Sequence, residues 1–224
     1  MTSPRKRAVV FISGGGSNMM ALVAAAKAGD YPAEIVGVIS DKADAGGLAK
    51  AAAEGIATFA FARKDYASKE AHEEAIFAAL DELSPDILCL AGYMRLLSGT
   101  FIQRYEGRMI NIHPSLLPLF PGLHTHQRAI DAGMRIAGCT VHFVTEGMDE
   151  GPVIGQAAVP VLSDDTADTL AARVLTVEHQ IYPQALKLFA EGKVAMKDGK
   201  AVSSGDNPAS AVGGKVVSLI GDRA

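Results

Sequence analysis

The stretch AVVFISGGGSNMM, residues 8–20, decides the expected fold. It opens with a nearly unbroken run of apolar and β-branched side chains, which is typical of a parallel strand covered on both faces. Three consecutive glycines (Gly14, Gly15 and Gly16) end this run, and an alanine-rich helical pattern begins near Asn18. A strand, a glycine turn and a helix in this order indicate a βα unit.

The same alternation continues along the chain. Strand-like runs at 34–41, 57–62 and 86–92 alternate with helical patterns, and Ser68 is the expected N-cap of the helix at 68–83. Repeated βα units predict an α/β protein with a doubly wound, Rossmann-like, mainly parallel sheet. Ligands of such sheets bind at the carboxyl ends of the strands.

The second half of the chain has a different pattern. RMINIH is a further strand, and the runs at 139–146 and 157–162 are expected to form an antiparallel pair, followed by a long helix at about 165–190. Asp-Gly within AMKDGKAV predicts a hairpin. We expect a single domain over 1–202 and a loosely ordered tail over the Ser-, Gly- and Ala-rich residues 203–224.

Composition limits the class of partner. The 224 residues are 49% hydrophobic and carry a formal charge of −4, which gives no electrostatic footprint for nucleic acid or an anionic membrane. No apolar run approaches the roughly 18 residues that span a bilayer. Cys89 and Cys139 lie in apolar runs without C-x-x-C spacing, as buried thiols of a reducing compartment do. We therefore expect a cytoplasmic protein that binds small molecules, with no nucleic-acid or membrane partner.

The glycine loop is a candidate phosphate site. Glycines let the backbone approach a ligand, and the helix that follows presents unpaired N–H groups and the positive end of its dipole. No Gly-Lys-Ser/Thr follows, and Met19 stands at the third glycine position of the dinucleotide fingerprint, so a nicotinamide cofactor is not expected. Asp41 therefore only imitates the ribose-binding acid of that fingerprint. A tight structural turn is the alternative.

Asn111 and His113 end the strand within MINIH and precede a loop stiffened by three prolines. They are two residues apart, so in an extended segment they project to the same side. An amide and an imidazole together can stabilise an oxyanion and move protons, as acyl transfer requires. The alternative is a pair of polar residues that cap a strand. A zinc site of His113, His124 and His126 is less favoured, because no partner stands at ligand spacing.

Two acidic positions remain open on the residues alone. Asp149 lies with Glu146 and Glu150 in a loop flanked by glycines, where acids are usually solvated. Glu178 falls on the apolar stripe of the long helix, where a carboxylate either tips into water or faces a ligand.

Six motifs together resemble the folate-dependent formyltransferases, in that family's order and spacing over about residues 7–195. They are ISGGGSN, LAGYMRLLS, NIHPSLLP, FPGLHTH, GCTVHFVTEGMDEGPVI and VEHQIYP. The resemblance implies the formyltransferase fold. PGLHTH favours the branch that acts on glycinamide ribonucleotide over the methionyl-tRNA branch, which carries an extra C-terminal domain. Formyltetrahydrofolate deformylases have an additional N-terminal domain, whereas the first strand here begins by Ala8.

The resemblance implies a reaction. The amine of glycinamide ribonucleotide attacks the formyl carbon of 10-formyltetrahydrofolate, the co-substrate, giving formylglycinamide ribonucleotide and tetrahydrofolate in purine biosynthesis. No metal and no nicotinamide is implied. A hydrolytic deformylase and a non-catalytic binding module are the rival hypotheses. Whether the chain is a monomer or a homodimer is left open.

The resemblance also implies roles for individual residues. Asn111 and His113 would stabilise the oxyanion, and Asp149 would set the protonation of His113 and order a water. The residues expected to bind the phosphate and ribonucleotide are Gly14, Gly15, Gly16, Ser17, Asn18 and Glu178. Those expected to bind the folate are Lys69, Met94, Arg95, Leu97, Val144 and Asp149.

The chain departs from the family pattern at two positions. Gly15 stands where the family often has a polar residue, which puts the details of the phosphate contacts in doubt. Lys69 stands where an arginine meets the folate glutamate tail, so the charge is kept but bidentate geometry is lost.

Overall fold

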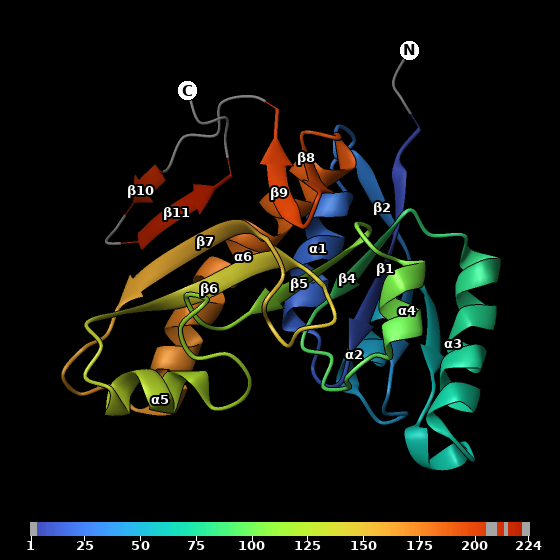
Figure 1. Cartoon of the computed structure of the whole chain (residues 1–224), viewed down its shortest axis with the longest axis horizontal. Helices are drawn as coiled ribbons and strands as arrows, with labels where there is room; N and C mark the ends of the chain where they lie inside the picture. Colours follow the sequence, from blue (N-terminus) through green and yellow to red (C-terminus); the bar gives the residue numbers. More distant parts are fainter. Residues whose placement is uncertain (1–3, 205–209, 213–214, 221–224) are drawn as a thin grey trace. The chain divides into compact units, whose positions relative to one another are not determined.

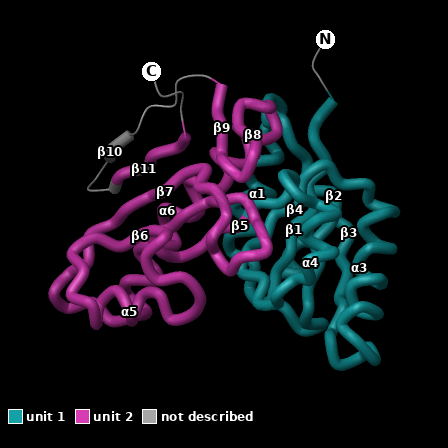
Figure 2. The backbone as a smooth tube through the Cα atoms, viewed as in Figure 1, with its two compact units in different colours: residues 1–110 teal, residues 111–224 magenta. Residues whose placement is uncertain are grey.

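The computed structural model describes residues 4–204, 210–212 and 215–220. The chain divides into two compact units, residues 1–110 and 111–224, coloured teal and magenta in Figure 2. The boundary falls within strand β5 (Met109–His113).

The first unit is the predicted run of βα units. Its four parallel strands stand in the order β4-β1-β2-β3, so the chain winds outward from β1 and then returns to its other side (Figure 1). The strands are β1 (Lys6–Ile12), β2 (Ala33–Ser40), β3 (Ala57–Ala60) and β4 (Ile87–Leu90). The helices are α1 (Ser17–Ala26), α2 (Gly46–Ala53), the 3-10 turn η1 (Arg63–Asp65), α3 (Lys69–Leu83) and α4 (Gly99–Arg104).

Local sequence explains these elements. The apolar run within β1 is fully buried from Ala8 to Ile12, as expected for a central strand between helices. Ser68 caps α3 as predicted, because its hydroxyl accepts from the backbone N–H of Ala71 at 3.1 Å.

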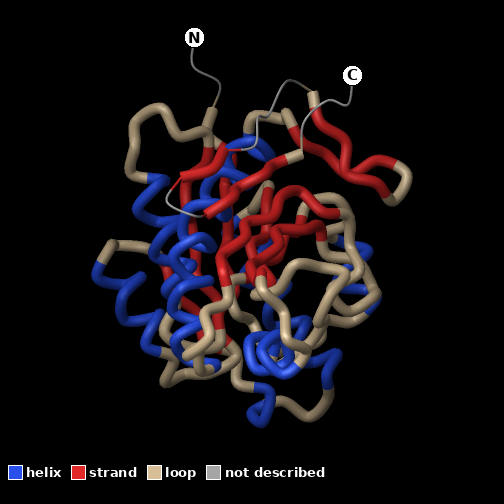
Figure 3. Tube along the Cα trace, turned by 90° about the vertical axis from the view of Figure 1, so that its left-hand side faces the viewer, coloured by secondary structure: helices blue, strands red, loops and turns tan. Residues whose placement is uncertain are grey.

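In the second unit the strands stand in the order β10-β11-β7-β6-β5, and β11 pairs antiparallel with both β10 and β7. β6 and β7 pair antiparallel as predicted. The strands are β6 (Ile136–Phe143), β7 (Val153–Pro160), β8 (Val194–Lys197), β9 (Lys200–Ser203), β10 (Ser210–Val212) and β11 (Lys215–Leu219). The helices are α5 (Thr125–Asp131) and α6 (Ala167–Ala190). Figure 3 shows the helices of the chain in blue and its strands in red.

Helix α6 packs against β6 and β7 through the predicted stripe. Leu170, Val174, Val177 and Ile181 are all fully buried. Thr166 begins the helix with a capping box, in which its side chain accepts from the N–H of Thr169 and the hydroxyl of Thr169 accepts in return. The long helix thereby covers one face of the antiparallel strands.

Part of the segment predicted as a loose tail is described, and it forms strands. The Asp198-Gly199 turn closes the predicted hairpin between β8 and β9. β11 pairs antiparallel with β7, and the N–H of Ile220 donates to the carbonyl of Ile154. Residues 205–209, 213–214 and 221–224 of this tail lie outside the described residues. The single domain over 1–202 stays a prediction.

Within the described ranges, no helix is long and apolar enough to cross a membrane.

Candidate active site

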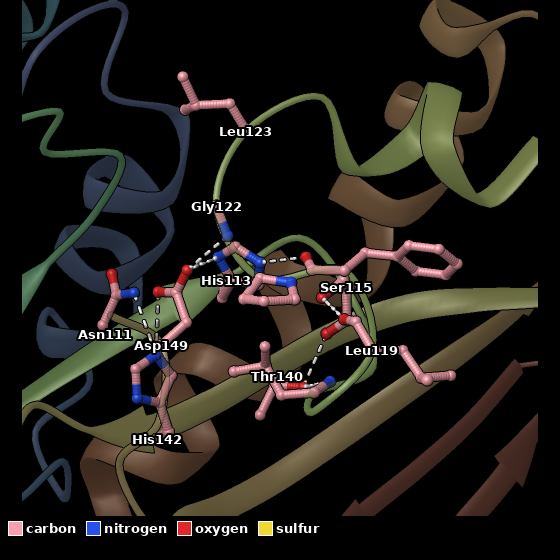
Figure 4. A network of polar contacts seen from close by, with 12 residues as sticks. Asn111, His113, Ser115, Leu119, Gly122, Leu123, Thr140, His142 and Asp149 are labelled. Atoms are coloured by element: carbon pink, nitrogen blue, oxygen red, sulfur yellow. Dashed lines mark hydrogen bonds and ion pairs between the residues drawn. The ribbon is translucent and has the colours of Figure 1, made fainter. Parts of the chain in front are cut away.

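The polar residues at the end of β5 lie where alternation along the strand predicts. Ile110 and Ile112 enter the core, while Asn111 and His113 take the other side. Figure 4 shows His113 turned toward Asp149 and Asn111 turned toward His142. The predicted trio of Asn111, His113 and Asp149 is therefore brought into one cluster.

His113 is held at both ring nitrogens. Its Nδ1 lies 3.3 Å from Oδ2 of Asp149, and its Nε2 lies 3.1 Å from the carbonyl oxygen of Phe120. The ring is almost fully buried. Because both nitrogens face acceptors, the doubly protonated ring can donate to each of them. Asp149 and the loop carbonyl together fix the plane of the imidazole.

Asp149 occupies an uncommon backbone conformation. It lies in the connection between β6 and β7 with a φ of 57°, the left-handed region that few residues other than glycine adopt. Its Oδ2 also accepts from the N–H of Gly122 at 2.8 Å. The loop after β5 is thereby tied to the loop after β6, with His113 between them. Strained residues held in this way cluster at functional sites.

His142 is a member of the cluster that sequence reasoning missed. It is buried on β6, with Nε2 3.2 Å from Nδ2 of Asn111 and Nδ1 2.8 Å from the carbonyl oxygen of Phe143. Burial lowers the pKa of His142 below its ordinary value, against the opposing effects of the Phe143 hydrogen bond and the Asp149 charge. Within CTVHF, residues 139–143, this histidine alternates with apolar residues, and that alternation was the only sign in the sequence that it faces the same side as a site. Nothing in the sequence indicated that it contacts Asn111.

A buried polar network supports the loop after β5. Thr140 on β6 accepts from the N–H of Leu117 at 3.0 Å and donates to the carbonyl of Ser115 at 2.7 Å. Gln156, which faces Thr140 across the β6–β7 pair, donates to the carbonyl of Leu117 at 2.8 Å. Proline-restricted backbone and these anchors together make the loop a rigid mount for His113.

The glycine loop is shaped by close packing at one of its three glycines. Gly16 has a φ of 68°, and a Cβ there would lie 2.9 Å from Cε of Met19 and 3.0 Å from Cα of Gly47. A Cβ at Gly14 or Gly15 would meet nothing within 4 Å. The turn thus needs Gly16 for structural reasons, whereas Gly14 and Gly15 leave open space. The phosphate site stays a prediction.

Two contacts join the loop to α2. The N–H of Gly47 donates to the carbonyl of Gly14 at 3.0 Å, and Nζ of Lys50 donates to the carbonyl of Gly15 at 2.8 Å. α1 begins directly after the loop at Ser17, with Asn18 buried. The backbone N–H groups of this first turn are the donors on which the predicted phosphate site depends.

Glu178 is buried on α6, so the alternative that its carboxylate points into water is wrong. Burial raises the pKa of the Cys139 thiol on β6, and the charge of Glu178 raises it further. The stripe of α6 thus carries its carboxylate inside the unit. A contact with substrate stays a prediction.

In the first unit, a cavity of about 280 Å³ gathers four of the predicted folate residues: Lys69, Met94, Arg95 and Leu97. Arg63 adds a further positive charge to the lining. Val144 and Asp149, the other two predicted folate residues, belong to the second unit.

Asp41 has a role that the sequence argument did not foresee. It is buried after the end of β2, and its Oδ2 accepts from Nε of Arg95 at 3.0 Å. The side chain of Arg95 is about half exposed. Asp41 therefore orients an arginine of the cavity wall. Burial raises the pKa of the neighbouring Tyr93, and the charge of Asp41 raises it further.

In the part of the chain that the structure describes, no group of three or more histidine, cysteine, aspartate or glutamate side chains could hold a metal ion. His113, His124 and His126 therefore do not form the zinc site that was considered. His124 is the N-cap residue that precedes α5, and His126 lies on that helix.

A family model described as formyl transferase matches residues 6–186, so the chain belongs to the formyl transferase family. Among its relatives, phosphoribosylglycinamide formyltransferase of Escherichia coli is 46% identical over 193 residues, which are 86% of this chain and 91% of that protein. The bovine trifunctional purine biosynthetic protein adenosine-3 is 49% identical, and this chain spans only 19% of its length.

Solved structures agree with this assignment. Phosphoribosylglycinamide formyltransferase of Brucella melitensis is 70% identical with a TM-score of 0.81, over 89% of this chain and all of that one. A formyltetrahydrofolate deformylase from Pseudomonas putida has the same TM-score of 0.81 but is 27% identical, over 89% of this chain and 70% of that one. The predicted family and fold class are confirmed, and the deformylase is the more distant relative.

Proposed function

We propose that this chain transfers the formyl group of 10-formyltetrahydrofolate to the amine of glycinamide ribonucleotide. The observation that carries the proposal is the buried cluster in which His113 lies 3.3 Å from Asp149 with Asn111 beside them. Acyl transfer needs a donor for the developing oxyanion and a group that moves protons, and this cluster contains both. The likeness to named formyltransferases supports the choice of substrates.

The reaction has two bond changes. The amine nitrogen attacks the formyl carbon, and the carbonyl oxygen becomes an oxyanion that accepts hydrogen bonds. The bond between that carbon and N10 of the folate then breaks, and a proton lost from the amine must reach N10. Asn111 donates an amide N–H to the oxyanion, while His113 and Asp149 hold the proton and a water that carries it.

The geometry limits what His113 can do for the oxyanion. Its Nε2 is directed at the carbonyl of Phe120 and its Nδ1 at Asp149, so a substrate oxygen must share one of these N–H groups. The 3.3 Å contact to Asp149 is the longer one and the easier to share. Asn111 is therefore the main oxyanion donor, and His113 contributes a shared N–H.

Substrate binding is assigned to both units. In this proposal the glycine loop with Ser17 and Asn18 binds the phosphate, and Glu178 contacts the ribose or the amine end. Lys69 and Arg95 bind the carboxylates of the folate tail, beside the apolar Met94 and Leu97. Val144 and Asp149 contact the pterin. The cytoplasmic location, the oligomeric state and the absence of metal and nicotinamide remain predictions.

A transfer assay with an omitted substrate tests the proposal. The purified chain is incubated with 10-formyltetrahydrofolate, with and without glycinamide ribonucleotide, while tetrahydrofolate, formate and formylglycinamide ribonucleotide are quantified. We expect tetrahydrofolate and formylated ribonucleotide in equal amounts, and only when the amine is present. Formate release that does not depend on the amine would instead establish a deformylase. Absence of turnover in both mixtures would support the hypothesis of a non-catalytic binding module.

A further inference from the structure

His142 lies behind the predicted trio without a role in it. The ring is buried on β6 and contacts Asn111 through Nε2 and the carbonyl of Phe143 through Nδ1. Both ring nitrogens therefore contact protein atoms. Its position raises the question of what it does to Asn111.

The two contacts determine which nitrogen of the ring carries the proton. A carbonyl oxygen can only accept, so the 2.8 Å contact with Phe143 requires a hydrogen on Nδ1. A neutral ring then has a lone pair on Nε2, which can only accept. Because burial lowers the pKa of His142, the neutral ring is the favoured form at pH 7.

The tautomer in turn determines how the amide of Asn111 lies. An asparagine amide can present either its NH₂ group or its oxygen to a neighbour. Because Nε2 of His142 is an acceptor, the NH₂ group must face it, which is the observed orientation with Nδ2 at 3.2 Å. One N–H of that group is then used, and the second remains for a substrate oxygen.

We propose that His142 is a positioning residue, whose Nδ1-protonated neutral ring fixes the amide of Asn111 so that an N–H, and not the amide oxygen, is presented to the oxyanion. This inference rests on the proposed function, since it names what sets the oxyanion donor of that reaction. The ring touches no substrate and acts only through Asn111.

Charges around the ring explain why a histidine that stays neutral is needed. Oδ1 of Asp149 lies 3.8 Å from Nε2 of His142, and His113 is close enough to disfavour a second positive charge. If Nε2 were protonated, it would donate toward Asp149 or toward the oxygen of a rotated Asn111. The first change would compete with the contact between Asp149 and His113, and the second would turn the NH₂ group of Asn111 out of its place. The neutral ring therefore keeps both Asp149 and Asn111 in their places.

Three variants test the role by activity. His142→Leu removes the acceptor with a similar volume, His142→Gln supplies an amide oxygen in its place, and His179→Leu makes the same replacement at a histidine of α6 that has no role in the site. Loss of an oxyanion donor costs about 10²–10³ in kcat, so a donor that is only misoriented part of the time should cost roughly 10- to 100-fold in His142→Leu.

We expect the KM of both substrates to stay near wild type in His142→Leu, because the ground-state contacts are unchanged. His142→Gln should recover most of the lost kcat, and His179→Leu should match the wild type. Equal kcat in His142→Leu and wild type, or a glutamine variant as slow as the leucine variant, would overturn the proposal.

A spectroscopic measurement on the unmutated chain is independent of turnover and of how well the variants fold. Nitrogen-15 chemical shifts of the labelled histidine rings distinguish the two tautomers, and His142→Gln identifies the signal by its loss. We expect a neutral ring protonated at Nδ1 at pH 7. A ring protonated at Nε2, or at both nitrogens, would refute the inference even if transfer activity is found. Absence of transfer by the wild type, with the expected tautomer present, would instead refute the proposed function alone.

Discussion

Replacing single residues of the site should affect catalysis and binding differently. At Asp149 we expect the clearest difference between the effect on kcat and the effect on folate affinity. Asp149→Asn keeps the shape and the hydrogen bond from Gly122 but removes the charge that faces His113. Loss of an acid–base contribution typically costs about 10²–10⁴ in rate, so we expect kcat to fall by such a factor with little change in folate affinity. Steady-state kinetics and folate titration measure both quantities.

The double variant is the control for that prediction. His113→Ala alone should cost a similar factor, and His113→Ala with Asp149→Asn should cost far less than the product, because the two residues act as a unit. Multiplicative losses in the double variant, or a well-folded Asp149→Asn protein with near-wild-type kcat, would contradict the coupling between them.

Asp41 should affect binding and not chemistry. Asp41→Asn removes the charged acceptor that orients Arg95 in the cavity wall. Because the arginine is half exposed and solvent weakens the pair, we expect roughly a 3- to 10-fold increase in the KM of the folate co-substrate. The kcat should stay near wild type. Asp44→Asn, a change of the same kind at an exposed neighbour, is the matched control, and equal KM values in both variants would count against the assignment.

Local pattern pointed to Asn111 and His113, and the family resemblance added Asp149, but neither indicated the partners of these residues. Asn111 and His113 are two residues apart on a strand, so their common direction follows from local geometry. His142 and Asp41 act through contacts with residues 31 and 54 positions away, and no local pattern encodes such pairs. Asp41 was even set aside, because the only role considered for it was binding a ribose.

At the scale of elements, patterning predicted the long and regular parts. The burial of β1 and the stripe of α6 follow directly from runs and periods in the sequence. Helix α4 has only six residues, too few for a helical period, and depends on Ser98, which caps it and is itself held by the buried Glu73. β11 was missed because its KVVSL run lies within Ser-, Gly- and Ala-rich sequence and is specified by the edge of β7 that it joins.

Removal of β10 and β11 should reveal what β11 contributes. A chain that ends after Ser204 leaves the pairing edge of β7 at 155–158 without its partner strand. We expect the truncated chain to keep most of its kcat, to unfold at lower denaturant concentration and to aggregate more readily, because unpaired edges template association. Kinetics, urea unfolding and light scattering measure the three effects. A large loss of kcat in a folded truncated chain would show instead that this segment contributes to the site.

For the molecule as a whole, three histidines that lie fully or partly out of solvent should make stability depend on pH. Burial lowers the pKa of His126, His142 and His179, all in the second unit. The unfolded chain therefore binds more protons than the folded chain at pH values between these lowered pKa values and about 6.5. Stability should be highest above pH 6.5 and should fall as the pH is lowered through that window. His142 should contribute most, because His126 and His179 are partly exposed and solvent weakens their effect.

Urea unfolding at pH 7.5, 6.5 and 5.5 checks this sign. Carboxylates such as Asp86, whose pKa is lowered by the backbone N–H of Arg7, lose their contribution only near pH 4 and so do not interfere. His179→Gln should make the dependence shallower. A midpoint that stays constant or rises between pH 6.5 and 5.5 would show that these rings are not kept neutral by folding.

The left-handed backbone of Asp149 restricts how this position can drift during evolution. A codon for aspartate is one nucleotide away from codons for asparagine, glycine and glutamate. Asparagine and glycine accept a φ of 57° but carry no charge. Glutamate keeps the charge but adopts the left-handed region less readily than aspartate does. Each of these steps loses either the carboxylate or the backbone that places it. A lineage that keeps the reaction therefore has almost no neutral path through this residue, even though it lies in a loop, where substitutions are ordinarily the easiest to accept.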